Sequence, residues 1–548
     1  MSVSTTTELP EVSSMAPAPS LLKERLSVPW TAIPVVTACA AFFTYLNYIP
    51  LFYTDIWGHV GYGKWMLEHR TLPTEDPCLP LSAGVPVVDT SWLSQLLFGW
   101  LASVGGPEAL SLVFTVTLWC TYFLYTRAFY LLSGRIWLAL IGTFLTWFLG
   151  FGRHSIIRPE IFGGFCFATL IWMVVHGEPW RSRSAKLACD EEVDARTPWL
   201  LWIGVPVLFL AWTNLHGSFI IGLIVLGCHA VGRTLQVLWT RRSLWEVLRD
   251  RWVIRWTLLT ELALGATLVN PYGVDLLIES ALFGRNENLK DILEWYELKL
   301  VDAEGIQFSV AMLLWLGLYR FSRQRVSPTD ILLLLVFAAG MALVIRIIGW
   351  FAGVFALCMM PHITEVGSRL QDRWAARRMR GAESDRPESR RFVYTLVCLL
   401  VAWCGFALAP VGRQVLGGQP RPAASQYNER TPLGITKFLR ENPPRGLVYA
   451  PQWWSDWLAW DGPPGIKTVV STNIHLAPKR LWDGYMRVSK GETYWDNLLD
   501  RWAVQAVVVD KEKQKRLASE VRGSAVWKVI YEDDLGFIAT RRTASTSG

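Results

Sequence analysis

The chain has 548 residues, of which 52% are hydrophobic and 30 are tryptophan, and its mean hydropathy is +0.27. This composition excludes an ordinary water-soluble protein and indicates a polytopic membrane protein. The formal net charge of +7 does not indicate a nucleic-acid partner, because the basic residues lie in short loops between apolar segments, where the positive-inside rule explains them.

The N-terminal residues, 1–27, are rich in Ser, Thr and Pro and are expected to form a disordered cytoplasmic segment. The next segment, Trp30–Tyr53, is long enough to cross a hydrocarbon core of roughly 30 Å. It has no convincing cleavage site, so we interpret it as a retained first span. Because Lys23 and Arg25 precede this span, the positive-inside rule places Asp55, which follows it, outside the cytoplasm.

The polar segment 54–90 carries four prolines and is expected to form a long first external loop with a short helix around Gly61–His69. After this loop, Trp92–Val104 is apolar but too short to cross the bilayer alone. We therefore expect an interfacial helix there.

The following apolar segments alternate with loops in which the basic residues all fall on one side. These segments are Pro107–Leu132, Ile136–Phe151, Glu160–His176, Trp199–Thr213, Phe219–Trp239, Trp256–Val269, Phe308–Tyr319, Ile331–Ile345, Ile347–Met360 and Phe392–Val411. With the first span they predict about eleven transmembrane helices in a membrane domain over 28–411. We expect a multi-pass protein of the plasma (inner) membrane with its polar turns on the non-cytoplasmic face.

The C-terminal part has an ordinary soluble composition and is expected to follow a linker at 412–430. Helical spacing predicts a helix at Thr431–Glu441. Short β-branched runs predict strands at Gly446–Ala450, Lys467–Ser471, Ala503–Val509 and Trp527–Tyr531. The fold class is therefore an α-helical polytopic membrane protein with a small extracytoplasmic α/β domain over 431–548.

Asp55 stands directly after the first span, where a carboxylate is costly unless it faces water, a cation or a hydrogen-bond donor. It is a candidate general base or metal ligand, although a charge that marks a helix end explains it equally simply. Asp76 and Asp89 lie in the same loop and are candidates to share a divalent cation with Asp55. The need for a cation stays open, since a solvated turn also explains Asp76.

Two other external positions carry arginine. Arg153, His154 and Arg158 lie in one short connection, and Arg346 separates two apolar segments with almost no loop. Guanidinium groups match phosphate oxygens two at a time, so these residues are candidates to bind a phosphate. For Arg346, snorkelling toward the membrane surface is an alternative.

Further polar and aromatic side chains complete the candidate site. His59 and Asp89 in the first loop and Asn214 and His216 in a later turn offer hydrogen bonds of the kind that sugar hydroxyls accept and donate. Structural turns need the same residue types. In the C-terminal domain, Trp453, Trp454 and Asp456 follow a predicted strand. This arrangement suits carbohydrate or peptide recognition, and tryptophans also dock onto membranes.

Taken together, these features resemble the GT-C superfamily of polytopic glycosyltransferases, which take sugars from polyprenyl-phosphate or polyprenyl-diphosphate carriers. The shared features are an acid after the first span, a long first external loop with a helix, external Arg and His turns, and an outer C-terminal domain. The C-terminal layout is similar to that of oligosaccharyltransferase catalytic subunits, in which a tryptophan pair and an aspartate follow a strand. Here Ser455 separates Trp454 from Asp456, and Asp55 lacks the second acid of an Asp-x-Asp or Asp-Glu pair.

The resemblance implies transfer of a sugar from a polyprenyl-linked donor to a glycan, lipid or protein acceptor, with inversion in a single displacement. Asp55 would accept the acceptor's proton, while Arg153, Arg158 or Arg346 holds the leaving phosphate. Two alternatives stay open: a lipid or polysaccharide transporter, and a non-catalytic scaffold for envelope assembly. Catalysis requires Asp55 to share a cavity with the arginines.

Overall fold

The computed structural model describes residues 27–154, 156–177, 199–378 and 391–542. The expected disordered segment at the N-terminus, apart from residue 27, and the side chain of His154 lie outside the described residues. The chain divides into two compact units. One combines residues 1–45 with 381–419, and the other combines 46–380 with 420–548.

The first unit contains two apolar helices that pack closely. They are α2 (Ala32–Asn47, which ends in the second unit) and α16 (Arg391–Leu408), and the short helix α17 (Pro410–Val415) follows. The Thr44 hydroxyl donates to the Gly405 carbonyl at 3.2 Å. A Cβ atom on Gly405 would lie 2.9 Å from that of Ala40. Small residues therefore permit this close approach, as is common between membrane helices.

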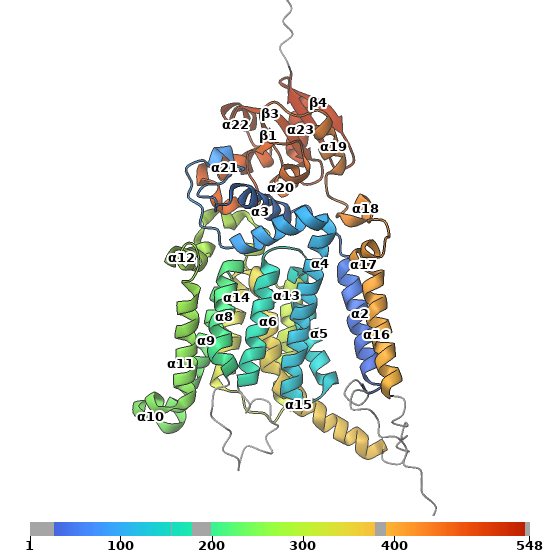
Figure 1. Cartoon of the computed structure of the whole chain (residues 1–548). Coiled ribbons are helices and arrows are strands. Elements are labelled where there is room, and N and C mark those ends of the chain that lie inside the picture. The colour runs from blue at the N-terminus through green and yellow to red at the C-terminus, as the bar shows by residue number, and fades with distance from the viewer. Residues whose placement is uncertain (1–26, 155, 178–198, 379–390, 543–548) are drawn as a thin grey trace, which may run out of the picture. The chain divides into compact units, whose positions relative to one another are not determined.

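Most of the long helices of the chain lie in the second unit, between Trp92 and Arg378 (Figure 1). These helices are α4 (Trp92–Ser133), α5 (Ile136–His154), α6 (Glu160–Gly177), α8 (Trp199–Leu215), α9 (Phe219–Arg241), α11 (Arg251–Thr267), α13 (Ala303–Phe321), α14 (Pro328–Leu343) and α15 (Ile348–Arg378). Within the described part of the chain, four segments are long and apolar enough to cross a membrane: Trp92–Ser133, Glu160–Gly177, Phe219–Arg241 and Ile345–Arg373. Five shorter apolar helices accompany them. The structure confirms a mostly helical membrane protein, whereas the count of about eleven spans stays a prediction.

Helix α4 is interrupted at Gly106, whose φ of 62° and ψ of −157° are not helical. Glycine adopts this conformation without the steric cost of a Cβ atom, and Pro107 then begins the second half. The prediction of two separate helices, at Trp92–Val104 and Pro107–Leu132, is confirmed by this break. Their positions in a membrane stay predictions.

Helix α3 (Ile56–His69) lies in the first loop and begins five residues before the expected Gly61, directly after Asp55. It crosses the first half of α4 with glycine at the contact. A Cβ atom on Gly63 would lie 1.8 Å from the Gln95 carbonyl oxygen, and one on Gly99 would lie 2.5 Å from the Gly63 carbonyl carbon. Only glycine at both positions permits this backbone contact.

Shorter elements fill the connections of the second unit. They are η1 (Pro80–Ser82), α10 (Leu244–Arg249), α12 (Val274–Leu282), η2 (Phe283–Arg285), η3 (Glu287–Asp291), η4 (Leu293–Trp295) and η5 (Ile345–Ile347). The sequence pattern left 274–302 without a predicted element. Its elements are the short helix α12 and three 3₁₀ turns, which lack the long apolar period that identifies a helix from sequence.

The C-terminal part contains a five-stranded mixed sheet. Its strands are β1 (Leu447–Tyr449), β2 (Lys467–Thr468), β3 (Val504–Asp510), β4 (Trp527–Glu532) and β5 (Gly536–Arg541), in the order β2-β1-β3-β5-β4. Strand β1 pairs in parallel with β2 and β3, whereas β5 pairs antiparallel with β3 and β4. The small sheet is confirmed, and β5 is the strand that the sequence pattern missed.

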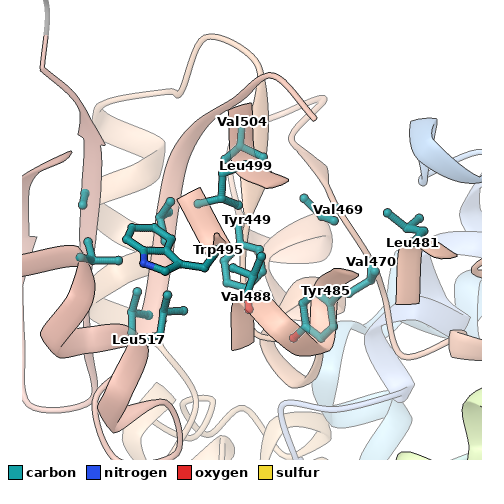
Figure 2. Close-up of a cluster of buried hydrophobic side chains, with 14 of the residues drawn as sticks. Tyr449, Val469, Val470, Leu481, Tyr485, Val488, Trp495, Leu499, Val504 and Leu517 are labelled. Carbon is teal, nitrogen blue, oxygen red and sulfur yellow. The ribbon is translucent and has the colours of Figure 1, made fainter. Parts of the chain in front are cut away.

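Six helices and one 3₁₀ turn accompany this sheet. They are α18 (Ala423–Gln426), α19 (Leu433–Glu441), α20 (Gln452–Asp461), η7 (Ile474–Leu476), α21 (Lys479–Ser489), α22 (Trp495–Arg501) and α23 (Lys515–Gly523). The core beneath them includes Tyr449, Val488 and Leu499, all fully buried, with Trp495 beside them (Figure 2). Burial of such aromatic and aliphatic side chains is the main source of the domain's stability.

Helix α20 packs against α3 and so connects the C-terminal part to the first loop. The Trp57 ring lies 5.0 Å from that of Trp457 and 5.5 Å from that of Trp460. A Cβ atom on Gly58 would lie 2.6 Å from Asp456 Oδ2. The expected boundaries at 28–411, 412–430 and 431–548 stay predictions.

Candidate active site

A cavity of about 270 Å³ lies among α3, the start of α4, the connection before α6, the turns η4 and η5, and residues 472–476. Its polar lining includes Asp55, His59, Tyr62, Asp89, Gln95, Arg158, Glu160, His216, Glu294, Arg346, Asn473 and His475. Segments far apart in the sequence therefore deliver ionisable side chains to one partly open cavity. Six of the predicted site residues are among them, namely Asp55, His59, Asp89, Arg158, His216 and Arg346.

Three arginines and three carboxylates form a connected cluster at this cavity. Arg153 pairs with Glu160 at 3.0 Å and with Glu294 at 2.7 Å. Arg158 pairs with Glu294 at 2.8 Å and, through Nε, with Asp55 at 3.1 Å. Charges of both signs at these distances stabilise one another where water is scarce.

Arg346 is the least committed cation of the three. It donates to Glu160 at 2.9 Å, but its second nitrogen lies 3.8 Å from Glu294, beyond hydrogen-bond distance. Its side chain is 25% exposed, compared with 11% for Arg153, and it lines the cavity whereas Arg153 does not. Arg346 therefore keeps donors available for an anion in the cavity.

The local sequence explains how these side chains are presented. Arg158 precedes Pro159, which favours an extended residue before it and opens α6. Glu160 then lies in the first turn of α6, where a carboxylate is stabilised by the helix dipole. Arg346 lies on the single turn η5, which connects α14 and α15, and so is not part of either long helix.

Asp55 occupies the N-cap position of α3 but makes no side-chain capping hydrogen bond there. Its carboxylate instead pairs with Arg158 and is 28% exposed, which makes it the most accessible acid of the cluster. An aspartate at this position usually accepts from the helix's own N–H groups. Its orientation toward the cavity is therefore set by tertiary contacts.

Glu294 links Arg153 and Arg158 from the turn η4. Burial would raise the pKa of its carboxyl, but the guanidinium groups of Arg158, Arg153 and Arg346 outweigh burial and lower the pKa to about 2. Glu294 is not among the site residues that the sequence pattern predicts. The available signal was that external arginines next to a membrane need anionic partners, and the connection at 283–302 carries several acids.

A second group of polar side chains lines another part of the cavity. Gln95 Nε2 lies 3.1 Å from Asp89 Oδ1 and 3.2 Å from His59 Nδ1. Burial raises the pKa of Asp89 to about 7 and lowers that of His59 to about 4. Near neutral pH His59 is therefore neutral, whereas Asp89 is about half ionised. Gln95 was not selected from the sequence, because one glutamine in an apolar helix has no distinguishing pattern.

The two polar residues of the turn after α8 have different environments. His216 lines the cavity, and burial lowers the pKa of its imidazole to about 4. Asn214 does not line the cavity. Its amide accepts from Trp92 Nε1 at 3.1 Å and donates to the Leu210 and Val269 carbonyls. Asn214 therefore joins three segments, as the structural interpretation predicts.

The aromatic motif of the C-terminal domain is only partly directed toward the cavity. Trp453 lines it and donates through Nε1 to Asp510 at 3.2 Å. Trp454 is fully buried in the domain and donates to the Arg430 carbonyl. Asp456 is 3% exposed and accepts from the Thr472 hydroxyl, and burial raises the pKa of its carboxyl to about 7.

The three acids proposed as metal ligands have separate partners. Asp55 pairs with Arg158, Asp89 accepts from Gln95 and Ser91, and Asp76 accepts from the Tyr62 hydroxyl at 2.5 Å. In the residues that the structure describes, no group of three or more His, Cys, Asp or Glu side chains is arranged to hold a metal ion. The shared cation site at Asp55, Asp76 and Asp89 therefore does not fit this geometry.

Comparison with known proteins identifies the fold. No family model matches the chain, and no curated protein matches its sequence. Among solved structures, the apo form of the Archaeoglobus fulgidus oligosaccharyltransferase matches with a TM-score of 0.52 and 14% identity, over 94% of this chain and 74% of that one. The same archaeal enzyme tethered to an acceptor peptide with an NVT sequon matches with the same TM-score and identity, over 96% and 74%. At this identity the likeness establishes the fold alone, in agreement with the expected GT-C architecture.

Proposed function

We propose that this protein is an integral membrane glycosyltransferase that moves a sugar from a polyprenyl-phosphate or polyprenyl-diphosphate carrier to an extracytoplasmic acceptor. The observation that supports it best is that Asp55, Arg158 and Arg346 line one cavity. A base for the acceptor and cations for the leaving phosphate are what this reaction requires. The oligosaccharyltransferase fold supports the same reaction class.

In this proposal the acceptor hydroxyl attacks the anomeric carbon of the sugar. The bond between that carbon and the phosphate oxygen breaks, its electron pair stays on the phosphate, and Asp55 takes the acceptor's proton. A single displacement of this kind inverts the anomeric centre. Arg346 and Arg158 stabilise the charge that develops on the phosphate, and such fixed charges act most strongly where water is excluded.

The remaining charged residues have supporting roles. Arg153 is engaged by both Glu160 and Glu294, so it holds these carboxylates rather than the substrate. Glu160 and Glu294 in turn fix the orientation of Arg346 and Arg158. The reacting groups are therefore held in place before substrate binds, which is the usual source of electrostatic catalysis. We also propose that this site faces the non-cytoplasmic side, as the basic loops indicate.

The test uses purified protein in nanodiscs with a panel of polyprenyl-linked sugars and simple glycan, lipid and peptide acceptors. Release of carrier phosphate or diphosphate is expected for at least one donor. The Asp55→Asn variant should lose about 10²–10⁴-fold in turnover, the range for removing a general base. The matched control is Asp534→Asn, since Asp534 is exposed in the turn between β4 and β5.

Two outcomes would contradict the proposal. Normal turnover in Asp55→Asn would remove Asp55 from the reaction. If every donor stays intact with every acceptor, the transporter or scaffold interpretation would replace the enzymatic one. Movement of an intact polyprenyl-linked sugar across a proteoliposome membrane would then select the transporter.

A further inference from the structure

The two histidines His59 and His216 line the cavity from different elements, and each has its Nδ1 atom occupied. A neutral imidazole has a proton on only one of its two ring nitrogens. A donor next to one nitrogen therefore places the proton on the other. The hydrogen-bond networks around both rings end on a backbone N–H, whose role as a donor is fixed. The protonation state of each ring can therefore be followed outward from the backbone.

For His59, the network begins at the backbone of Ser91. Its N–H donates to Asp89 Oδ1 at 2.9 Å, so Oδ1 is an acceptor. When Asp89 is ionised, the Gln95 atom 3.1 Å from Oδ1 is then the amide nitrogen, because two acceptor oxygens would repel. That nitrogen has a second hydrogen, which points to His59 Nδ1 at 3.2 Å.

The crossing of α3 and α4 explains why these groups meet. His59 lies one turn before Gly63 on α3, and Gln95 lies one turn before Gly99 on α4. The two glycines permit backbone contact at the crossing, which brings the preceding turns together. Asp89 and Ser91 lie immediately before α4, so the whole network is local to this crossing.

For His216, the network is shorter. The Ser218 N–H donates to Nδ1 at 3.1 Å. The Ser218 hydroxyl accepts from the Trp212 indole N–H at 3.0 Å, and an indole is only a donor. The hydroxyl hydrogen is then free to donate to His216 Nδ1 at 2.8 Å. Both available donors therefore point at the same nitrogen.

We propose that His59 and His216 are held as neutral imidazoles with the proton on Nε2, and that these two N–H groups bind oxygen atoms of the lipid-linked donor. The identity of the ligand rests on the function proposed above. The protonation state of the rings does not. Gln95 is then a positioning residue, because it acts only through His59.

The surroundings of the two rings agree with a neutral state. Protonation of Nδ1 on either ring would place an N–H against another donor, and burial lowers the pKa of both imidazoles to about 4. The charged groups that face His59 are Asp55, Arg158 and Arg346, of which the two arginines oppose its protonation. Glu160 favours protonation of His216, whereas Arg346 and Arg153 oppose it.

Neutral donors differ from the arginines in what they recognise. A guanidinium attracts negative charge, whereas a neutral N–H binds any oxygen lone pair, including that of a sugar hydroxyl. The cavity would therefore combine cations for the phosphate with uncharged donors for oxygens that carry less charge. Two sources are possible, namely the phosphate and the sugar ring, and the test separates them.

The direct test is ¹⁵N NMR of protein labelled only at histidine, in nanodiscs at pH 7, with resonances assigned by single His→Asn variants. Protonated and unprotonated ring nitrogens have well-separated shifts. His59 and His216 should each have an unprotonated Nδ1 and a protonated Nε2. His69 and His229 provide opposite references, because their Nδ1 atoms face carbonyl oxygens at 2.9 and 2.8 Å.

A matched variant tests the role of Gln95. In Gln95→Met the donor to His59 is lost, so a second set of His59 resonances with protonated Nδ1 should appear while His216 stays unchanged. The control Gln505→Met makes the same change at an exposed position on β3 and should leave both rings unchanged. A protonated Nδ1 in either wild-type ring would overturn the assignment for that ring.

The ligand is tested by titrating the same sample with polyprenyl phosphate, which lacks a sugar, and with an alkyl glycoside, which lacks a phosphate. A shift of the Nε2 resonances with the first probe assigns the N–H groups to phosphate oxygens, and a shift with the second assigns them to sugar hydroxyls. If neither probe shifts them, the oxygen-binding role is wrong. These readouts do not require turnover, so they stand apart from failure of the transferase assay.

Discussion

Two groups of paired arginines and carboxylates in the second unit have the same chemistry but differ in their exposure to solvent. Arg421 donates to both oxygens of Glu108 at 2.8 Å, and the two side chains are 7% and 3% exposed. In the cavity cluster, three arginines share three carboxylates, and Arg346 and Asp55 are 25% and 28% exposed. The first pair is closed to solvent, and the second group is open to it.

The difference shows what distinguishes a structural ion pair from a candidate site. Glu108 lies beside the break in α4, and Gln426 also donates to it, so the pair joins α4 to the segment before the C-terminal domain. Both side chains of the pair are almost fully buried in that arrangement. At the cavity, the shared carboxylates leave donors of Arg346 without close partners, which is the arrangement that an incoming anion can use.

The largest expected effect concerns the closed pair. Arg421→Met should lower the free energy of unfolding by about 3–5 kcal/mol, because Glu108 is left as an unpaired buried charge. Arg522→Met, which breaks an exposed pair with Glu532, should cost under about 1 kcal/mol. Thermal unfolding in detergent measures both. Equal losses in the two variants would mean that Arg421 is no more important for folding than a surface arginine.

The open cluster should respond in activity rather than stability. Arg346→Gln is expected to reduce turnover about 10²–10³-fold, the range for losing one preorganised charge contact, with little change in melting temperature. Arg346→Lys keeps the charge without the planar fork and should recover part of the loss. A large fall in melting temperature for Arg346→Gln would place Arg346 with the structural pairs.

Glu294 tests the competition between carboxylates and phosphate. Glu294→Gln releases Arg158 and Arg153 from an acid whose pKa is about 2, so polyprenyl phosphate should bind about tenfold more tightly, or 1.4 kcal/mol. Glu287→Gln is the control, since Glu287 is exposed in the same connection. Weaker binding in Glu294→Gln would show that the positioning of the arginines by Glu294 outweighs its competition with the phosphate.

The smallest expected effect is that of mild acid. An ordinary histidine with a pKa of about 6.5 would change its neutral fraction about fivefold between pH 5.5 and 6.5. His59 and His216 have pKa values lowered to about 4 by burial, so the transfer rate should change less than about twofold in this range. The unfolded chain binds these two protons below about pH 6.5 and the folded chain does not, so the contribution of His59 and His216 to the free energy of unfolding should fall as the pH drops from 6.5 toward 4. Asp89 and Asp456, whose pKa values burial raises to about 7, contribute with the opposite sign in this range. A rate that follows a pKa near 6.5 would contradict the buried, neutral state of both rings.

Much of the fold was accessible from local patterns. The break in α4 followed from a short apolar stretch before Pro107, and four of the five strands followed from β-branched runs. Strand β5 was missed because Gly536–Arg541 lacks a distinctive alternation and is defined by its pairing with β3 and β4. The number of spans stays a prediction, because several of the helices are shorter than a bilayer crossing needs.

By itself, the sequence determined that this is a helical membrane protein and that Asp55, Arg158, His216 and Arg346 lie in connections between helices, because hydropathy depends on local composition alone. Only the tertiary structure decided which of these residues meet. Glu294 and Gln95 became partners of the site, whereas Asn214 and Trp454 became structural, since each outcome depends on distances between segments far apart in the chain. The ion pairs and hydrogen bonds that define the site act over a few ångströms, and sequence spacing does not set such distances between separate helices.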